Sequence, residues 1–181
     1  MRNLDTIYSS CMHAQVSLVM TADKLCKKRN LPPLDITSGL SWVDVEESVL
    51  KTCNHLEKLA EQDKDIPKGF SGKIKKGFRN LCHHAGVGTT LSKMAPSDSY
   101  CAALCGGFKI VFMALEHTGR YREEIYKAID EIPTVLNDHK SLLELCEQDA
   151  ETHTLAAGLF ASLFGLLEEI LKWFLKPPVS M

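Results

Sequence analysis

The stretch Tyr100–Leu115 reads YCAALCGGFKIVFMAL, and Lys109 is its only charged residue. A helix that is apolar on all sides belongs in the middle of a bundle rather than at its edge. Gly106 and Gly107 lie inside the stretch, although each glycine destabilises a helix by about 1 kcal/mol relative to alanine. We therefore expect a nearly fully buried central helix over about 97–118, with a neighbouring helix approaching closely at the two glycines.

The segments on either side repeat apolar residues at intervals of three and four, which is the spacing of one helical face. Before the central helix, this pattern predicts helices over about 4–29, 42–60 and 71–84. After it, the pattern predicts helices over about 121–136, 142–146 and 150–175. No stretch alternates apolar and polar residues. The sequence therefore predicts an all-α bundle of six to seven helices with essentially no sheet.

Stop and start signals surround the first predicted loop, residues 30–40. Lys27-Lys28-Arg29 precedes the loop and places positive charge near the exposed carbonyl groups of a helix end. Pro32-Pro33 prevents the helix from continuing, because proline lacks an amide donor. Ser41 has the residue type of an N-cap, and Asp44 follows three positions later. We therefore expect the next helix to begin directly after Ser41.

The last predicted helix is apolar on more than one side. One stripe at helical spacing contains Leu155, Leu159, Leu163, Leu166, Ile170 and Trp173, and the small residues Ala157, Ala161 and Gly165 form another. The favoured interpretation is the core helix of a bundle, because the uncharged run 155–167 is shorter than the roughly 20 residues that span a membrane. The alternative is a segment that, once released, pairs with copies of itself or enters a bilayer interface.

Composition is that of an ordinary globular protein. The chain has 181 residues, of which 45% are apolar and 24% charged, and its net charge is −2. These values predict one domain over 1–176, divided into an N-terminal helix and loop (1–39) and a core (40–176), with 177–181 as the start of a linker or tail. A nearly neutral chain does not indicate a nucleic-acid partner. Seven cysteines without CxxC spacing predict reduced cytoplasmic thiols rather than disulfides.

Motifs with catalytic or metal-binding chemistry are weak. Gly86-Val87-Gly88-Thr89-Thr90 lacks the lysine of a phosphate loop and is interpreted as a helix end and turn. Cys82-His83-His84 together with Cys101 and Cys105 could supply zinc ligands, but core thiols are the favoured interpretation. The sequence contains no GxSxG or HExxH motif. We therefore expect no enzyme, cofactor or metal.

Charge is distributed unevenly along the chain. Residues 66–97 contain six basic residues and no acidic one, whereas residues 123–151 contain nine acidic residues and two lysines. The simpler interpretation is that these charged faces neutralise each other or are solvated. The alternative is a site for anionic lipid, with Phe70 and Phe78 entering the interface and the cations supplied by Lys68, Lys73, Lys75, Lys76 and Arg79.

Two runs carry a family resemblance. Pro96–Lys109 reads PSDSYCAALCGGFK and Arg122–Pro133 reads REEIYKAIDEIP, with Tyr-x4-Cys-Gly-Gly-x-Lys and Arg-Glu-x7-Glu-Ile-Pro as the most specific parts. They resemble the N-terminal helical domain that precedes NACHT or ankyrin regions in fungal NOD-like receptor proteins. The resemblance covers about residues 40–175. It carries over no catalytic residues, and the matching Gly106, Gly107 and Pro133 are interpreted as structural.

The resemblance implies an effector or signalling domain of an innate-immunity receptor that functions in programmed cell death. Such domains include HeLo-like helical bundles, similar to the four-helix domain of the necroptosis executioner pseudokinase, which damage membranes when oligomerised. We therefore expect a non-enzymatic cytoplasmic domain that self-associates, is recruited to anionic membranes and contacts other parts of a larger receptor chain. The alternative is a protein–protein interaction adaptor without membrane activity.

Overall fold

The computed structural model describes residues 4–36, 39–61, 70–83, 98–118 and 150–176, together with 125, 127–129, 131–132 and 134–135. The bounded helices in this part are α1 Leu4–Ile7, α2 Ser9–Arg29, α3 Trp42–Ala60, α4 Phe70–His83, α6 Asp98–Thr118 and α8 Ala150–Leu175. All regular secondary structure of the described residues is helical, which confirms the predicted all-α class. The helices expected over 97–118 and 150–175 are confirmed as α6 and α8.

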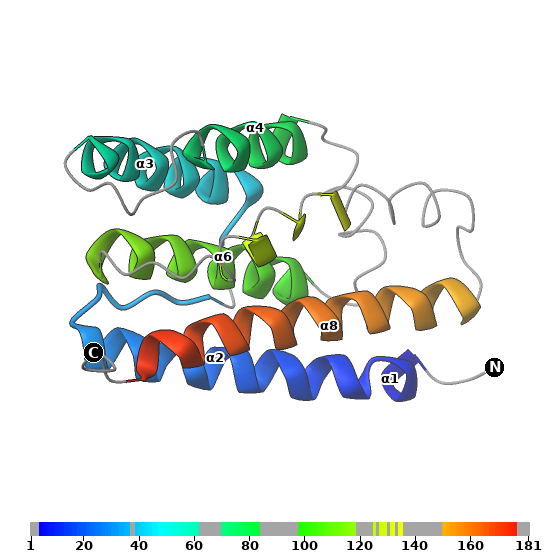
Figure 1. Cartoon of the computed structure of the whole chain (residues 1–181). Helices are drawn as coiled ribbons and strands as arrows, with labels where there is room; N and C mark the ends of the chain where they lie inside the picture. Colours follow the sequence, from blue (N-terminus) through cyan, green and yellow to red (C-terminus); the bar gives the residue numbers. More distant parts are fainter. Residues whose placement is uncertain are drawn as a thin grey trace.

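The helices are stacked in layers (Figure 1). α2 and α8 lie side by side, α6 packs on both of them, and α3 and α4 cover the other side of α6. α2, α6 and α8 run in the same direction, because Tyr8 contacts Tyr100 and His153 near the starts of α6 and α8. At the opposite end, Arg29 of α2 contacts Phe174 of α8. The first and last bounded long helices are therefore parallel neighbours.

α6 is the central helix that the sequence predicts, and residues 102–108 are all buried. A Cβ atom at Gly107 would lie 2.9 Å from Leu167 of α8 and 3.2 Å from Leu18 of α2, which confirms a close helix approach there. At Gly106 the neighbour is not a helix. Ile36, in the loop after α2, lies against it, and its Cα would be 2.8 Å from an added Cβ.

Local signals set the helix ends as predicted. The backbone N–H of Ser41 donates to Asp44 Oδ2 at 2.8 Å and its hydroxyl donates to the same oxygen at 2.7 Å, so α3 begins with the expected cap. α2 ends at Arg29, and the cap residue Asn30 has a φ of 52°, the left-handed conformation that asparagine tolerates. The first helix, expected to be continuous, consists of α1 and α2 joined at Tyr8.

The buried face of α8 overlaps the predicted stripe only in part, since Leu163 and Ile170 are buried as expected. Its fully buried residues include Phe160, Phe164, Leu167 and Leu171, whereas Leu155 of the predicted stripe is 61% exposed. α8 packs against both α2 and α6. Because its sequence is apolar on more than one side, periodicity alone does not select the face that these two neighbours cover.

Several predicted elements lie outside the described residues. They are the turn at 86–90, the short helix at 142–146 and the tail at 177–181. From the helix predicted over 121–136, Ile125, Ile129 and Ile132 are described, and they are buried as expected. They belong to the same hydrophobic core that extends from Tyr8 to Phe174.

Candidate functional site

The residues predicted to bind lipid belong to α4 and the segment before it. Lys68 lies outside the described residues, and nothing is described of the Lys73 side chain. Lys76 is exposed on α4. The structure therefore shows the surroundings of Lys75, Lys76 and Arg79, which lie within two turns of one helix.

Two of these cations contact α3, which packs antiparallel to α4. Lys75 Nζ donates to Asn54 Oδ1 at 3.0 Å, and Arg79 Nε lies 3.9 Å from Glu46 Oε1. The Arg79 side chain remains 51% exposed, and an ion pair of this kind contributes about 0–1 kcal/mol. Part of the basic charge of α4 is therefore balanced within the molecule by α3, although weakly.

Phe78 lies in the core. It is fully buried, and its ring packs edge to face against Phe108 and Phe112 of α6, with ring centroids 5.4 and 5.3 Å apart. The expectation that Phe78 enters a membrane interface is therefore wrong. The physical reason is that α4 is amphipathic, and its apolar face covers α6. The side chain of Phe70, the other aromatic residue in that expectation, is not among those described.

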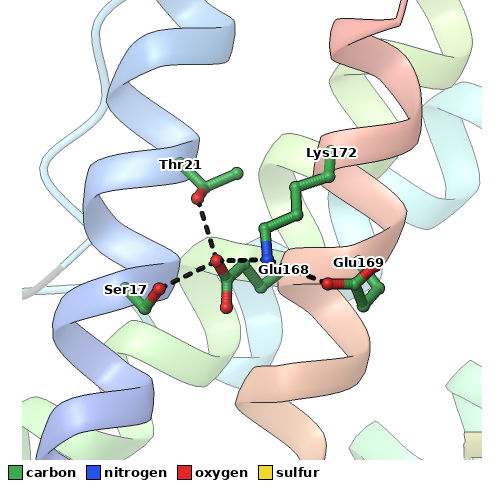
Figure 2. Close-up of polar contacts among 5 residues, drawn as sticks. All are labelled: Ser17, Thr21, Glu168, Glu169 and Lys172. Atoms are coloured by element: carbon green, nitrogen blue, oxygen red, sulfur yellow. Dashed lines mark hydrogen bonds and ion pairs between the residues drawn. The ribbon is translucent and has the colours of Figure 1, made fainter.

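A largely buried carboxylate joins α2 to α8 (Figure 2). Glu168 Oε1 accepts hydrogen bonds from Ser17 Oγ at 2.8 Å and from Thr21 Oγ1 at 3.3 Å, one turn apart on α2. Lys172 Nζ lies 2.9 Å from the same oxygen and also donates to Glu169 Oε1 at 2.8 Å. The Glu168 side chain is 13% exposed and that of Glu169 is 71% exposed. Glu168 is thus the interhelical partner of this cluster.

The electrostatics of Glu168 fit a structural clamp. Burial raises the pKa of its carboxyl, but hydrogen bonds from Lys172 and Ser17 and the charge of Lys172 outweigh burial, so the pKa lies below its ordinary value. A carboxylate that stays ionised at neutral pH holds no proton to give, so Glu168 is not poised as a general acid. Its role in the fold is to accept hydrogen bonds between the two parallel helices.

A second polar contact lies at the start of the same helix pair. Tyr8 Oη lies 3.1 Å from His153 Nδ1, and burial raises the pKa of Tyr8 to about 12.

Burial also raises the pKa of the adjacent Cys11 to about 12 and that of Cys53 to about 11. These thiols are therefore protonated at neutral pH, whereas nucleophilic and metal-binding chemistry requires the thiolate.

The structure describes two of the cysteines that were considered as zinc ligands. Cys105 is buried on α6 and Cys101 is partly buried. The side chains of Cys82 and His83, and all of His84, lie outside what is described. Among the residues that the structure describes, no group of three His, Cys, Asp or Glu side chains is placed to hold a metal ion.

The most distinctive surface feature is on α2. Met12, Val16 and Met20, here called the outer stripe, are 50%, 53% and 68% exposed. They are four residues apart and therefore share one side of the helix. Leu18 and Leu25 on the other side are fully buried. The outer stripe was not predicted from the sequence, because apolar residues at helical spacing can equally form the core.

Comparison with protein-family models, with curated proteins and with solved structures finds no match for this chain. The geometry of the described helices, the outer stripe of α2 and the charged surface of α4 are therefore the observations from which a function is argued. Of these, the outer stripe departs most from what packing of this fold requires, because large apolar side chains gain nothing from water contact.

Proposed function

We propose that this chain is a non-enzymatic signalling domain that acts by self-association. The outer stripe of α2 is the observation that carries this proposal. Apolar anchors at positions i, i+4 and i+8 are the pattern by which one helix docks on another apolar surface. Burying such side chains is favourable by about 25 cal/mol for each Å² removed from water. α2 is held firmly against α8, so the stripe is already in place for binding.

The resemblance of residues 96–109 and 122–133 supports a setting for this proposal. In that setting, the domain is the effector part of a fungal NOD-like receptor and functions in programmed cell death during innate immunity. Other parts of the larger receptor chain would drive oligomerisation in the cytoplasm. Self-association through α2 would then convert receptor assembly into a clustered array of effector domains.

The proposal includes recruitment to anionic membranes through α4. Lys76 is exposed and Arg79 is half exposed. Each basic residue near an anionic surface contributes about 1 kcal/mol, which is comparable to the weak pair that Arg79 forms with Glu46. Lipid phosphate could therefore replace the α3 contact at little cost.

Among the residues that the structure describes, two helices have the length and composition of a membrane span, namely Ser99–His117 within α6 and Ala150–Leu175. In the bundle, 72% of the apolar segment of α6 and 50% of that of α8 are buried. Insertion of either helix into a bilayer would expose the core of the bundle to water. We therefore propose surface recruitment of the folded domain rather than spanning.

The contacts of α4 with α3 favour a second candidate, an interaction adaptor without membrane activity. Lys75 and Arg79 are already engaged by Asn54 and Glu46. In this candidate the same surface of mixed charge binds another protein chain. Binding would then weaken with salt and would not require lipid.

The experiment compares Val16→Glu with Val43→Glu, because Val43 on α3 is equally apolar and 73% exposed. Sedimentation velocity over a range of protein concentrations measures self-association, and expression of each variant in cells measures toxicity. We expect the wild-type chain and Val43→Glu to associate with increasing concentration and Val16→Glu to remain monomeric and less toxic. Equal association of all three chains would contradict the role of the outer stripe, and a monomeric wild-type chain would contradict self-association.

A further inference from the structure

The outer stripe continues into charged residues at both ends. On a helix with 100° per residue, Asp5 and Lys27 fall within about 20° of Val16, and Met12 and Met20 fall within about 40°. All five residues are exposed. Exposed Asp23 also falls within about 20° of Val16 and pairs with Lys27. One line on the surface therefore begins with an acid, passes over three apolar side chains and ends with the ion pair of Asp23 and Lys27.

This line is continuous across the junction of α1 and α2. The backbone N–H of Tyr8 donates to the carbonyl of Leu4 at 3.0 Å, and that of Met12 donates to the carbonyl of Tyr8 at 2.9 Å. Tyr8, at φ −91° and ψ 3°, separates the two helices, and these two bonds hold α1 end to end with α2. Asp5 consequently stays on the same side of the helix as Val16.

We propose that the outer stripe binds the outer stripe of a second copy of this chain in an antiparallel arrangement, with the two-fold axis at Val16. This inference rests on the proposed self-association and specifies its geometry. Val16 then packs on Val16 of the second copy, and Met12 packs on Met20 of the second copy. Such a two-fold interface is self-complementary and closes at a dimer.

The charges select this orientation. Asp5 and Lys27 lie at equal distances in sequence before and after Val16, so the antiparallel pair places each Asp5 opposite Lys27 of the second copy. A parallel pair would place Asp5 opposite Asp5 and Lys27 opposite Lys27, and like charges that face each other are destabilising. The dipoles of two antiparallel helices also oppose each other favourably, with the acidic start beside the basic end.

The surroundings of the stripe are compatible with this arrangement. Lys27 Nζ contacts Asp23 Oδ2 at 2.6 Å on the same helix, which holds the lysine on the outer side. α8 is bound elsewhere on α2, through Ser17 and Thr21, which both donate to Glu168. The dimer therefore forms without opening the bundle.

The expected affinity is low. One helix from each copy gives an interface at the small end of specific interfaces, below about 1,200 Å² in total, and interfaces of this size are weak or transient. Linking several copies in one assembly raises their effective concentration and makes a weak contact productive. The pairing is thus one that assembly of a larger chain would switch on.

Cysteine cross-linking tests the orientation. Single variants Val16→Cys and Met12→Cys, and a mixture of Met12→Cys with Met20→Cys chains, are oxidised under mild conditions, and disulfide dimers are measured on non-reducing gels. The wild-type chain, oxidised in parallel, is the control for the native thiols. We expect dimers for Val16→Cys and for the mixture, and background levels for Met12→Cys alone. Dimers of Met12→Cys alone would show a parallel pair and overturn the inference.

Charge reversal gives an independent readout. We expect Asp5→Lys and Lys27→Asp each to weaken dimerisation in sedimentation equilibrium by roughly tenfold, since each changes two symmetric pairs, and the double variant to restore it. In a parallel pair, the double variant would restore nothing. If the wild-type chain dimerises but neither the Val16→Cys cross-link nor the charge rescue is seen, the orientation is wrong and self-association stands. If the wild-type chain stays monomeric at all concentrations, both proposals are wrong.

Discussion

Arg29 Nη2 donates a hydrogen bond to the carbonyl oxygen of Phe174 at 2.7 Å, so the last turn of α2 caps the last turn of α8. Because the two helices are parallel, their carboxyl ends lie together, and each leaves carbonyl groups without partners in its own helix. Arg29 Nε contacts the same oxygen at 3.2 Å, and Lys28 Nζ contacts the carbonyl of Leu175 at 2.6 Å. The basic end of α2 thus compensates the carbonyls of its neighbour.

This cap predicts that Arg29→Ala lowers the free energy of unfolding by about 1.5–3 kcal/mol, the usual contribution of hydrogen bonds to a charged group. Arg29→Lys should retain only part of this stabilisation, because lysine lacks the planar guanidinium group that contacts one oxygen through two nitrogens. Urea denaturation followed by circular dichroism measures both values. Lys24→Ala, at an exposed position of the same helix, is the control and should leave the midpoint unchanged. An unchanged midpoint for Arg29→Ala would show that the cap contributes nothing.

Glu168 predicts a stability that depends on pH. Its pKa is lower in the folded chain than in the unfolded chain. The clamp therefore contributes fully above the unfolded value of about 4.3 and is lost as pH falls through the folded value. We expect Glu168→Gln to lower the free energy of unfolding at pH 7 by about 1–2 kcal/mol and to flatten its decline below about pH 5. Urea denaturation from pH 7 to pH 3 measures this.

The control for that experiment is Glu169→Gln. Glu169 shares Lys172 with Glu168 but is 71% exposed and contacts no residue of α2 through this cluster. Its replacement should change the stability at pH 7 by less than about 0.5 kcal/mol. Equal effects of the two substitutions would show that the ion pairs to Lys172, rather than the hydrogen bonds to α2, carry the stabilisation.

The sequence was sufficient for features that depend on local chemistry. The single charge between Tyr100 and Leu115 identified the central helix, and Ser41 with Asp44 identified the start of α3. Where a helix is apolar on two sides, the sequence did not predict which side is buried. α8 buries Phe160 and leaves Leu155 exposed, because the positions of α2 and α6 decide which side is covered.

The candidate sites likewise combine features that the sequence predicts with features that only packing determines. The basic run of α4 could be read from composition, but its contacts with Asn54 and Glu46 depend on how α3 packs. The outer stripe depends on which residues of α2 the other helices leave uncovered. Spacing alone does not distinguish Met12 and Val16 from core residues, so only the packed bundle identifies them as a surface.

Gly106 predicts a substitution that is harmful in spite of helix propensity. Gly106→Ala should gain about 0.5–1 kcal/mol from propensity, but its methyl group would overlap Ile36, whose Cα lies 2.8 Å from the added carbon. Overpacking of this kind costs about 1–3 kcal/mol, so we expect a net loss in urea denaturation. Gly158→Ala on α8 is the matched control, since nothing lies within 4 Å of its added Cβ and it should be stabilising. A stabilising Gly106→Ala would show that the loop at Ile36 adapts freely.

Membrane recruitment predicts that Lys76→Glu weakens binding to anionic vesicles. Lys76 is exposed on α4, and each basic residue near an anionic surface contributes about 1 kcal/mol, so charge reversal should reduce partitioning by at least about fivefold. Co-sedimentation with vesicles that contain phosphatidylserine, and with neutral phosphatidylcholine vesicles, measures this. Lys24→Glu is the control, because it reverses an exposed charge on α2 and has the same net charge as Lys76→Glu. It should bind vesicles as the wild-type chain does. Equal loss in both variants would indicate that net charge alone drives binding. Equal binding to neutral and anionic vesicles would exclude the α4 site. No binding to either kind of vesicle would favour the adaptor, because an adaptor surface needs a protein partner rather than phosphate charge.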